Sequence, residues 1–157
     1  MDKTAAQTLL NMGNPNVNFV RKEDILLSVQ VAIPVCYADQ VQATLRQAVY
    51  RFPRFDIIIH NVDMPPTSIE HIVGQTIPKD YACHIIDHRI TGLEKQQGDR
   101  LKTAIGALFA SGYGYKYSMK LNGRYMPKTN LFGDAITYMA ANPDVDFVGY
   151  PYDHPDI

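Results

Sequence analysis

The sequence predicts an α/β sandwich of three layers with a mainly parallel sheet, and two observations support this fold class. Short segments rich in apolar and β-branched residues, such as residues 25–34 and 55–61, are typical of buried strands. Segments whose apolar residues recur every three or four positions lie between them, as expected for helices. This alternation of strands and helices, over 157 residues of which 46% are hydrophobic, favours a single domain of that class.

The first strand and helix follow from residues 25–52. The run "ILLSVQVAIP" is almost continuously apolar, so we expect a strand covered on both faces that ends at Pro34. Asp39 is positioned to cap the following helix, which ends before Pro53. One face of that helix is expected to be apolar and to contain Val41, Leu45, Val49 and Phe52.

Two further strands are expected in the middle of the chain. "FDIIIHN" at 55–61 predicts the second strand and "YACHIID" at 81–87 the third. The proline-rich loop between them includes a weak helical turn at 69–73. A polar connection, residues 88–99, follows the third strand.

The last third of the chain repeats the alternation. "YKYSMKL" at 115–121 predicts the fourth strand, Thr129 or Asn130 caps a helix that runs through Met139, and "FVGY" at 147–150 predicts a short fifth strand. The helix before the fourth strand is marked by Leu101, Ile105 and Leu108 on its apolar face and by Gly112 and Gly114 at its end.

Residues 1–22 read as a polar N-terminal arm, with a short helix at 4–10, and residues 23–157 as the single domain. The net charge of −1 gives no strong nucleic-acid signal. Two cysteines, Cys36 and Cys83, favour free thiols in a reducing compartment. Neither a signal peptide nor an apolar run of about 20 residues is recognisable, so we expect a soluble cytoplasmic protein without a membrane span.

Polar side chains follow the predicted strands, and ligands of open parallel sheets bind at those carboxyl ends. The fourth strand runs directly into "KLNGRY", where Lys120 supplies positive charge and Arg124 a planar fork that fits phosphate oxygens. Gly123 allows the backbone to turn or to approach a ligand. An ordinary surface loop with two cations remains the alternative.

Other motifs carry weaker signals. Glycine-rich nucleotide loops and the GxSxG hydrolase elbow are absent. His84 and His88 have a spacing that can bind zinc, which leaves a metal-dependent hydrolase as an outside possibility. "DVD", Asp144 to Asp146, is either a cation site or a solvated turn, and His60 is either functional or simply a polar strand end.

The order of these segments resembles the GT-A family of glycosyltransferases, from about residue 25 to residue 150. "VQVAIPVCY" resembles the family's first strand and turn, and "FDIIIHNVD" its second strand. "GDRLKTAIG" resembles the family's GxxxAxNxG helix, with Ala104 in place of the asparagine. "KLNGRY" stands where the family has its metal-binding Asp-x-Asp motif and resembles the variant K-x-[ST]-G-R-Y.

The resemblance implies a GT-A-like, Rossmann-like domain with a short C-terminal half that binds a nucleotide-diphosphate sugar and transfers the sugar to an unknown acceptor. No cofactor is expected, and a divalent metal is possible but not expected, because cations replace the aspartate pair. Candidate catalytic residues are Asp63, His60 and Arg124, with Asp153 as a further candidate base. Candidate substrate-binding residues are Pro34, Val35, Tyr37, Asn61, Arg100, Lys120, Asn122, Gly123 and Tyr125.

The missing Asp-x-Asp motif and the short C-terminal half also allow a second interpretation. The chain would then be a non-catalytic nucleotide-sugar-binding or regulatory module on a degenerate GT-A fold. Turnover of a donor sugar separates the two hypotheses.

Overall fold

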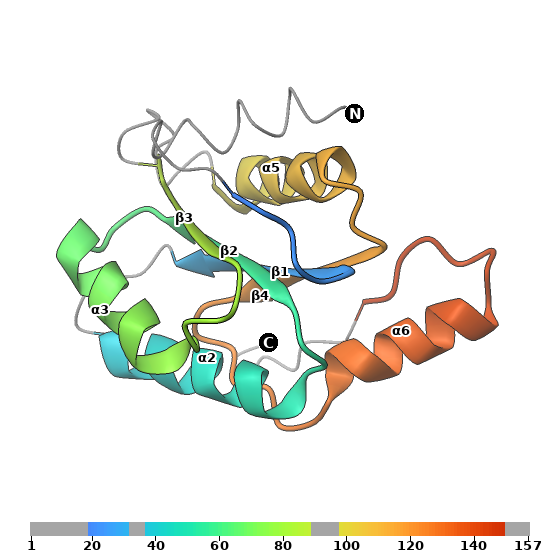
Figure 1. Ribbon diagram of the computed structural model, residues 1–157, viewed down its shortest axis with the longest axis horizontal. Coiled ribbons are helices and arrows are strands. Elements are labelled where there is room, and N and C mark those ends of the chain that lie inside the picture. Colours follow the sequence, from blue (N-terminus) through green and yellow to red (C-terminus); the bar gives the residue numbers. More distant parts are fainter. Residues whose placement is uncertain (1–18, 32–36, 89–97, 150–157) are drawn as a thin grey trace, which may run out of the picture.

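The structure is a computed structural model that describes residues 19–31, 37–88 and 98–149 (Figure 1). It confirms an α/β fold with a parallel sheet. The elements, in chain order, are β1 (Ile25–Val31), α2 (Ala38–Arg51), β2 (Asp56–Asn61), α3 (Pro66–Thr76), β3 (Cys83–Asp87), α5 (Gly98–Gly112), β4 (Tyr117–Asn122) and α6 (Leu131–Ala141).

The four strands form one parallel sheet in the order β3-β2-β1-β4. The chain moves outward from β1 to β3 and then returns to the other side of β1 for β4. Crossovers between parallel strands are right-handed, so this change of direction requires α5 to cover the opposite face of the sheet from α2 and α3. Figure 1 shows α5 on one side of the sheet and α2, α3 and α6 on the other.

An apolar core lies on each face of the sheet. Between the sheet and α2, α3 and α6, one set of strand side chains packs on fully buried residues such as Leu45 and Phe55. On the α5 face, Ile58 packs with Phe109, whose ring meets that of Phe19 edge to face at 5.3 Å between centroids. Phe19 lies in the stretch predicted to be a polar arm, so the last residues of that stretch contact the domain core.

Two helices differ in detail from the sequence prediction. The weak turn expected at 69–73 is part of the 11-residue helix α3, which starts with Pro66 in its first turn, where the missing N–H of proline costs nothing. Helix α2 has Tyr37 at its N-cap and Asp39 inside its first turn, so the prediction that Asp39 caps it is wrong. Of the two predicted caps of α6, Thr129 and Asn130, the structure shows Asn130, whose side chain accepts a hydrogen bond from Gly133 N.

The predictions for Leu108 and for the fifth strand are also wrong. Leu108 is 39% exposed, whereas Ile105 is buried as predicted and shares the buried face of α5 with Lys102 and Phe109. Residues 147–149 are not a strand, and Phe147 is 83% exposed. A β-rich tetrapeptide forms a strand only where a sheet edge pairs with it, which the local sequence does not specify.

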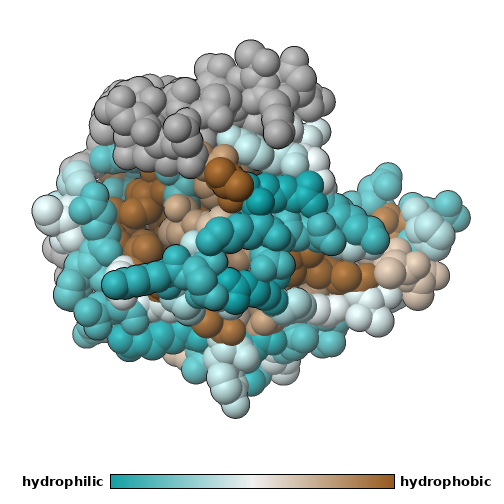
Figure 2. Space-filling view, in the orientation of Figure 1, coloured by the Kyte–Doolittle hydropathy of each residue, from teal (hydrophilic) through white to brown (hydrophobic). Residues whose placement is uncertain are grey.

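The surface view in Figure 2 is largely hydrophilic, with hydrophobic residues visible beside α6. Among the described residues, none of the helices has the length and apolar character needed to cross a membrane.

Candidate functional site

The strand order reverses between β1 and β4, because β2 and β3 lie on one side of β1 and β4 lies on the other. Loops that leave neighbouring strands on opposite sides of such a reversal separate and form a crevice at the carboxyl edge of the sheet. The "KLNGRY" segment supplies the last three residues of β4, Lys120 to Asn122, and the turn that follows at this point. The fold therefore brings the strongest polar motif of the sequence to the place where open α/β sheets usually bind ligands.

A short turn after β4 fixes the backbone of that motif. Gly123 N donates to Gln30 O at 2.8 Å, which continues the pairing of β1 and β4 by one residue. Tyr125 N donates to Asn122 O at 2.9 Å, and Arg124 N donates to the Asn122 side chain at 3.0 Å. Gly123 does not have a positive φ, so it does not form a left-handed turn. Its backbone is buried directly after β4.

The Arg124 side chain extends from this turn to the start of α2. Its guanidinium lies over the ring of Tyr37, with 4.1 Å between Cζ and the ring centroid, and its Nε donates to Gln40 Oε1 at 2.8 Å. Neither Nη group of Arg124 donates a hydrogen bond within the described residues. The outer edge of the guanidinium is therefore available, and that edge can hold two phosphate oxygens at once.

The first turn of α2 lies beside this guanidinium. Tyr37, its N-cap residue, makes no capping hydrogen bond through its side chain. The first N–H groups of a helix have no partner within the helix and carry partial positive charge, which suits an anion. Asp39 in the same turn is exposed and contributes the opposite charge. Arg124 is therefore the main fixed positive charge at this corner.

Lys120 and Asn122 lie on a different side of β4 from the Arg124 guanidinium. The register pairs Lys120 with Ser28 and Asn122 with Gln30, and both partners belong to the face of the sheet that α5 covers. Arg124 contacts α2 instead, on the other face. The structure therefore does not bring the two cations of the motif together. Tyr125 lies beside Arg124 and is 41% exposed.

The carboxyl end of β2 carries two more candidates. Asn61 is fully buried and closes the loop after β2, since its amide donates to Met64 O at 2.8 Å and its Oδ1 accepts from Met64 N. Asp63 is half-buried in the same loop. Because β2 and β4 flank β1, their carboxyl ends lie two strand spacings apart, about 10 Å. Asp63 and the β4 turn therefore belong to the same edge of the sheet.

Four candidates cannot be assessed from the described residues. Pro34, Val35 and Asp153 lie outside them, and so does the side chain of Arg100, whose backbone belongs to the first turn of α5.

A buried polar network lies under α5, and His60 is at its centre. His60 Nε2 is 3.0 Å from Ser28 Oγ, and His60 Nδ1 is 2.8 Å from His88 Nε2. The two imidazole rings are stacked with 5.1 Å between their centroids. The three residues run diagonally across β1, β2 and the end of β3, and the ring of His60 has no exposed surface. His60 consequently cannot touch an acceptor directly in this conformation.

The network is held in its neutral form. Burial, together with the neighbouring His88, Lys102 and His84, lowers the pKa of His60 to about 3. Burial and Lys102 lower the pKa of His88 to about 4, against a smaller opposing effect of Asp87. Each neutral imidazole has one donor and one acceptor nitrogen, so the two hydrogen bonds of His60 can both be satisfied.

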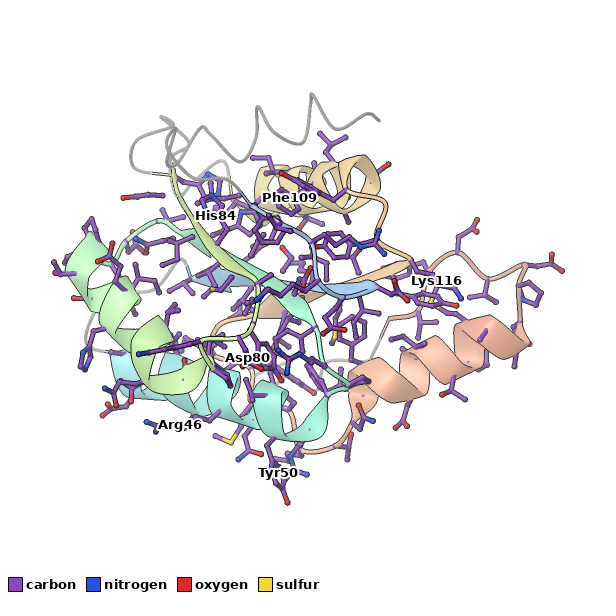
Figure 3. All side chains as sticks on the ribbon, viewed as in Figure 1. Arg46, Tyr50, Asp80, His84, Phe109 and Lys116 are labelled. Atoms are coloured by element: carbon purple, nitrogen blue, oxygen red, sulfur yellow. The ribbon has the colours of Figure 1, made fainter. Side chains whose placement is uncertain are left out.

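The sequence patterns considered above did not identify this network as a unit, although a signal was present. Ser28 and Gln30 alternate with apolar residues in β1, and His60, His84 and His88 occupy corresponding alternate positions in β2 and β3. Because side chains of a strand alternate between its two faces, this period of two indicates one polar stripe on a single face of the sheet. Figure 3 shows His84 and Phe109 in the layer between the sheet and α5.

Replacing Gly106 by alanine is expected to lower the free energy of unfolding by about 1–3 kcal/mol. A Cβ on Gly106 would lie 2.8 Å from Ser28 Oγ and 3.7 Å from His60 Nε2, so α5 would be pushed away from the network. Gly74→Ala in α3 is the matched control, because its Cβ would meet no atom within 4 Å. Urea unfolding of both variants measures the difference; equal stabilities would contradict close packing over Ser28.

Metal binding finds no support among the described residues, which contain no group of three or more His, Cys, Asp or Glu side chains placed to hold an ion. His84 and His88 lie on one face of β3 and its end, but a hydrogen bond to His60 occupies His88 Nε2. Around Asp144, Val145 N donates to Asn142 O at 2.9 Å, so "DVD" belongs to a turn after α6 with both aspartates exposed.

A hollow of ≈ 530 Å³ lies at the opposite edge of the sheet, between α6 and the amino ends of β1 and β4. Its lining mixes charges of both signs, including Asp24, Arg54, Lys116 and Asp134. This mixture does not favour a charged ligand of either sign, so the carboxyl edge remains the candidate site.

Comparisons with protein-family models, with curated proteins and with solved structures find nothing that matches this chain.

Proposed function

We propose that the chain is a glycosyltransferase that uses a nucleotide-diphosphate sugar as donor and binds the diphosphate at the β1–β4 strand reversal. One observation carries the proposal: the Arg124 guanidinium is held at that reversal by Tyr37 and Gln40, with both Nη groups directed to no described partner. The resemblance to GT-A glycosyltransferases in the order of motifs supports the donor class.

In the proposed reaction, the bond between the anomeric carbon and the diphosphate oxygen breaks as a new bond to the acceptor oxygen forms. The leaving diphosphate gains negative charge during this step. Arg124 would stabilise that charge more in the transition state than in the ground state, which accelerates the reaction. Lys120 leaves β4 toward the other face, so we do not include it among the diphosphate contacts.

Asp63 is the proposed base that takes the proton of the acceptor. It lies at the carboxyl end of β2, on the same edge of the sheet as Arg124, and the residue is half-buried with its Oδ2 enclosed. His60, the other candidate base, is enclosed under α5 with both ring nitrogens engaged. Its proposed contribution is to fix the ends of β1, β2 and β3 relative to α5.

A non-catalytic nucleotide-sugar-binding module is the second candidate function. Specific observations favour it: within the described residues, no carboxylate pair lies at the end of β4 to hold a metal, and the histidine at the end of β2 is enclosed. Such a module would bind the same ligand through Arg124 without breaking the sugar–phosphate bond.

Turnover that persists without a divalent metal is the expected result of a donor assay. Release of nucleoside diphosphate and transfer of sugar to water or to candidate acceptors are measured for a panel of nucleotide sugars, first with excess chelator and then with added manganese or magnesium. Arg124 replaces the charge of the metal, so chelation should change the rate less than about twofold.

The same assay separates the hypotheses. Asp63→Asn should lower turnover about 100-fold while diphosphate binding is retained, since a general base commonly contributes that much. If the protein binds a nucleotide sugar but turns over none of the donors in the panel, the non-catalytic module is favoured. Loss of turnover on chelation with recovery on metal addition would contradict metal independence.

A further inference from the structure

The ring of Tyr37 is occupied in the free protein. The guanidinium of Arg124 covers one face of that ring at 4.1 Å from its centroid, while Gln40 accepts the Nε hydrogen of the same guanidinium. These two contacts come from residues three positions apart at the start of α2 and fix two different features of the Arg124 side chain. The ring fixes the plane of the guanidinium, and the amide oxygen fixes its rotation within that plane.

The inner and outer edges of the guanidinium are thereby distinguished. A hydrogen bond at Nε uses the inner edge, so the two Nη groups form the outer edge and remain available for a ligand. Without a fixed rotation, the planar fork would have to be ordered when the ligand binds, and that ordering would oppose binding. Because the Arg124 fork is already ordered in the free protein, ligand binding avoids this ordering cost.

On this basis we infer that Tyr37 and Gln40 are positioning residues that act on the diphosphate through Arg124, rather than residues that bind the nucleotide base. The inference deepens the proposed function and rests on it. It also differs from the sequence-based expectation that Tyr37 is itself a substrate-binding residue, and a direct base contact and the positioning of Arg124 predict different ligand dependence. A base contact requires a nucleoside, whereas positioning of Arg124 matters for any ligand with a diphosphate group.

Titration calorimetry of the full chain with uridine, guanosine, cytidine and adenosine diphosphates and with inorganic pyrophosphate tests the assignment. Tyr37→Leu should weaken pyrophosphate and the preferred nucleoside diphosphate by the same factor, about fivefold. Tyr37→Phe retains the ring and should restore binding. Gln40→Met removes the acceptor at similar side-chain size and should weaken both ligands like Tyr37→Leu.

The matched control is Tyr50→Leu. Tyr50 lies at the other end of α2, is 80% exposed, and also has a guanidinium over its ring, that of Arg51 at 5.6 Å. Its replacement should leave all affinities unchanged. In addition, Tyr37→Leu should have no further effect once Arg124 is alanine, because a residue that acts through Arg124 loses its role with it.

A ligand-free measurement completes the test. The Nε–Hε signal of Arg124, identified by its loss in Arg124→Lys, should move in Tyr37→Leu, which removes the aromatic ring beside it, and stay in place in Tyr37→Phe. An unmoved signal, or a Tyr37→Leu effect confined to nucleosides and additive with Arg124→Ala, would overturn the inference. Failure of the wild-type protein to bind any diphosphate would overturn the proposed function instead, while the Nε–Hε signal would still decide whether Tyr37 positions Arg124.

Discussion

Replacing Arg124 by alanine is expected to weaken diphosphate binding about 100-fold while the fold stays intact. The Nη edge of the guanidinium can form two charge-assisted hydrogen bonds, each worth about 1.5–3 kcal/mol, and part of that free energy is recovered by water. The side chain is exposed and lies outside both apolar cores, so its removal leaves the packing of the sheet unchanged. Calorimetric titration with nucleoside diphosphates and thermal unfolding measure the two effects separately.

Arg124→Lys should behave more like the alanine variant than like the wild type. A lysine ammonium is a point charge that cannot present two parallel N–H groups or lie flat on the ring of Tyr37. Arg46→Ala is the control. Arg46 is an exposed arginine of α2, the helix that begins after Tyr37, and Figure 3 shows it on the outer side of that helix. Unfolding of Arg124→Ala without a separable loss of binding would instead make Arg124 a structural residue.

Acidification is expected to destabilise the protein steeply between pH 6.5 and about pH 4. The pKa of His60 is lowered to about 3 and that of His88 to about 4, from 6.5 in the unfolded chain. Lowered histidine pKa values mean that the unfolded state binds more protons, so the stabilising contribution is complete above pH 6.5 and is lost as the pH falls. Two such groups together cost about 2–3 kcal/mol per pH unit in this window.

Chemical unfolding at a series of pH values measures this dependence. His88→Gln removes one titrating group but keeps an amide that can hydrogen-bond to His60 Nδ1, so it should reduce the slope by about half. His71→Gln is the control, because His71 is exposed on α3 and outside the network. An unchanged slope in His88→Gln would show that the buried pair is not the source of the acid sensitivity.

The strands and most helices could be predicted because their signals are local. The almost continuously apolar run that predicted a strand with both faces covered is β1, in which all seven residues are buried. Helix α6 has the expected cap at Asn130. Where burial depends on a neighbouring element, local patterns failed: Lys102 is 1% exposed because it faces the histidines, while the apolar Leu108 of the same helix faces solvent.

The candidate site could be predicted only where its signal is local. The motif at the end of β4 was visible, because strand and polar residues are contiguous in sequence. The contacts of Arg124 with Tyr37 and Gln40 were not visible, because they join residues 84 or more positions apart, and neither was the divergence of Lys120 from Arg124, which depends on the sheet register. The Ser28–His60–His88 network similarly requires three strands in a fixed alignment.

A crystal structure of the protein soaked with nucleoside diphosphates tests whether Arg124 holds the diphosphate at the β1–β4 strand reversal. We expect a diphosphate at the β1–β4 strand reversal, with its oxygens within hydrogen-bond distance of both Nη groups of Arg124 and no metal ion bridging them. A diphosphate bound in the hollow against α6, held by Lys116 or Arg54, or one bridged by a metal ion at Asp144 and Asp146, would contradict it.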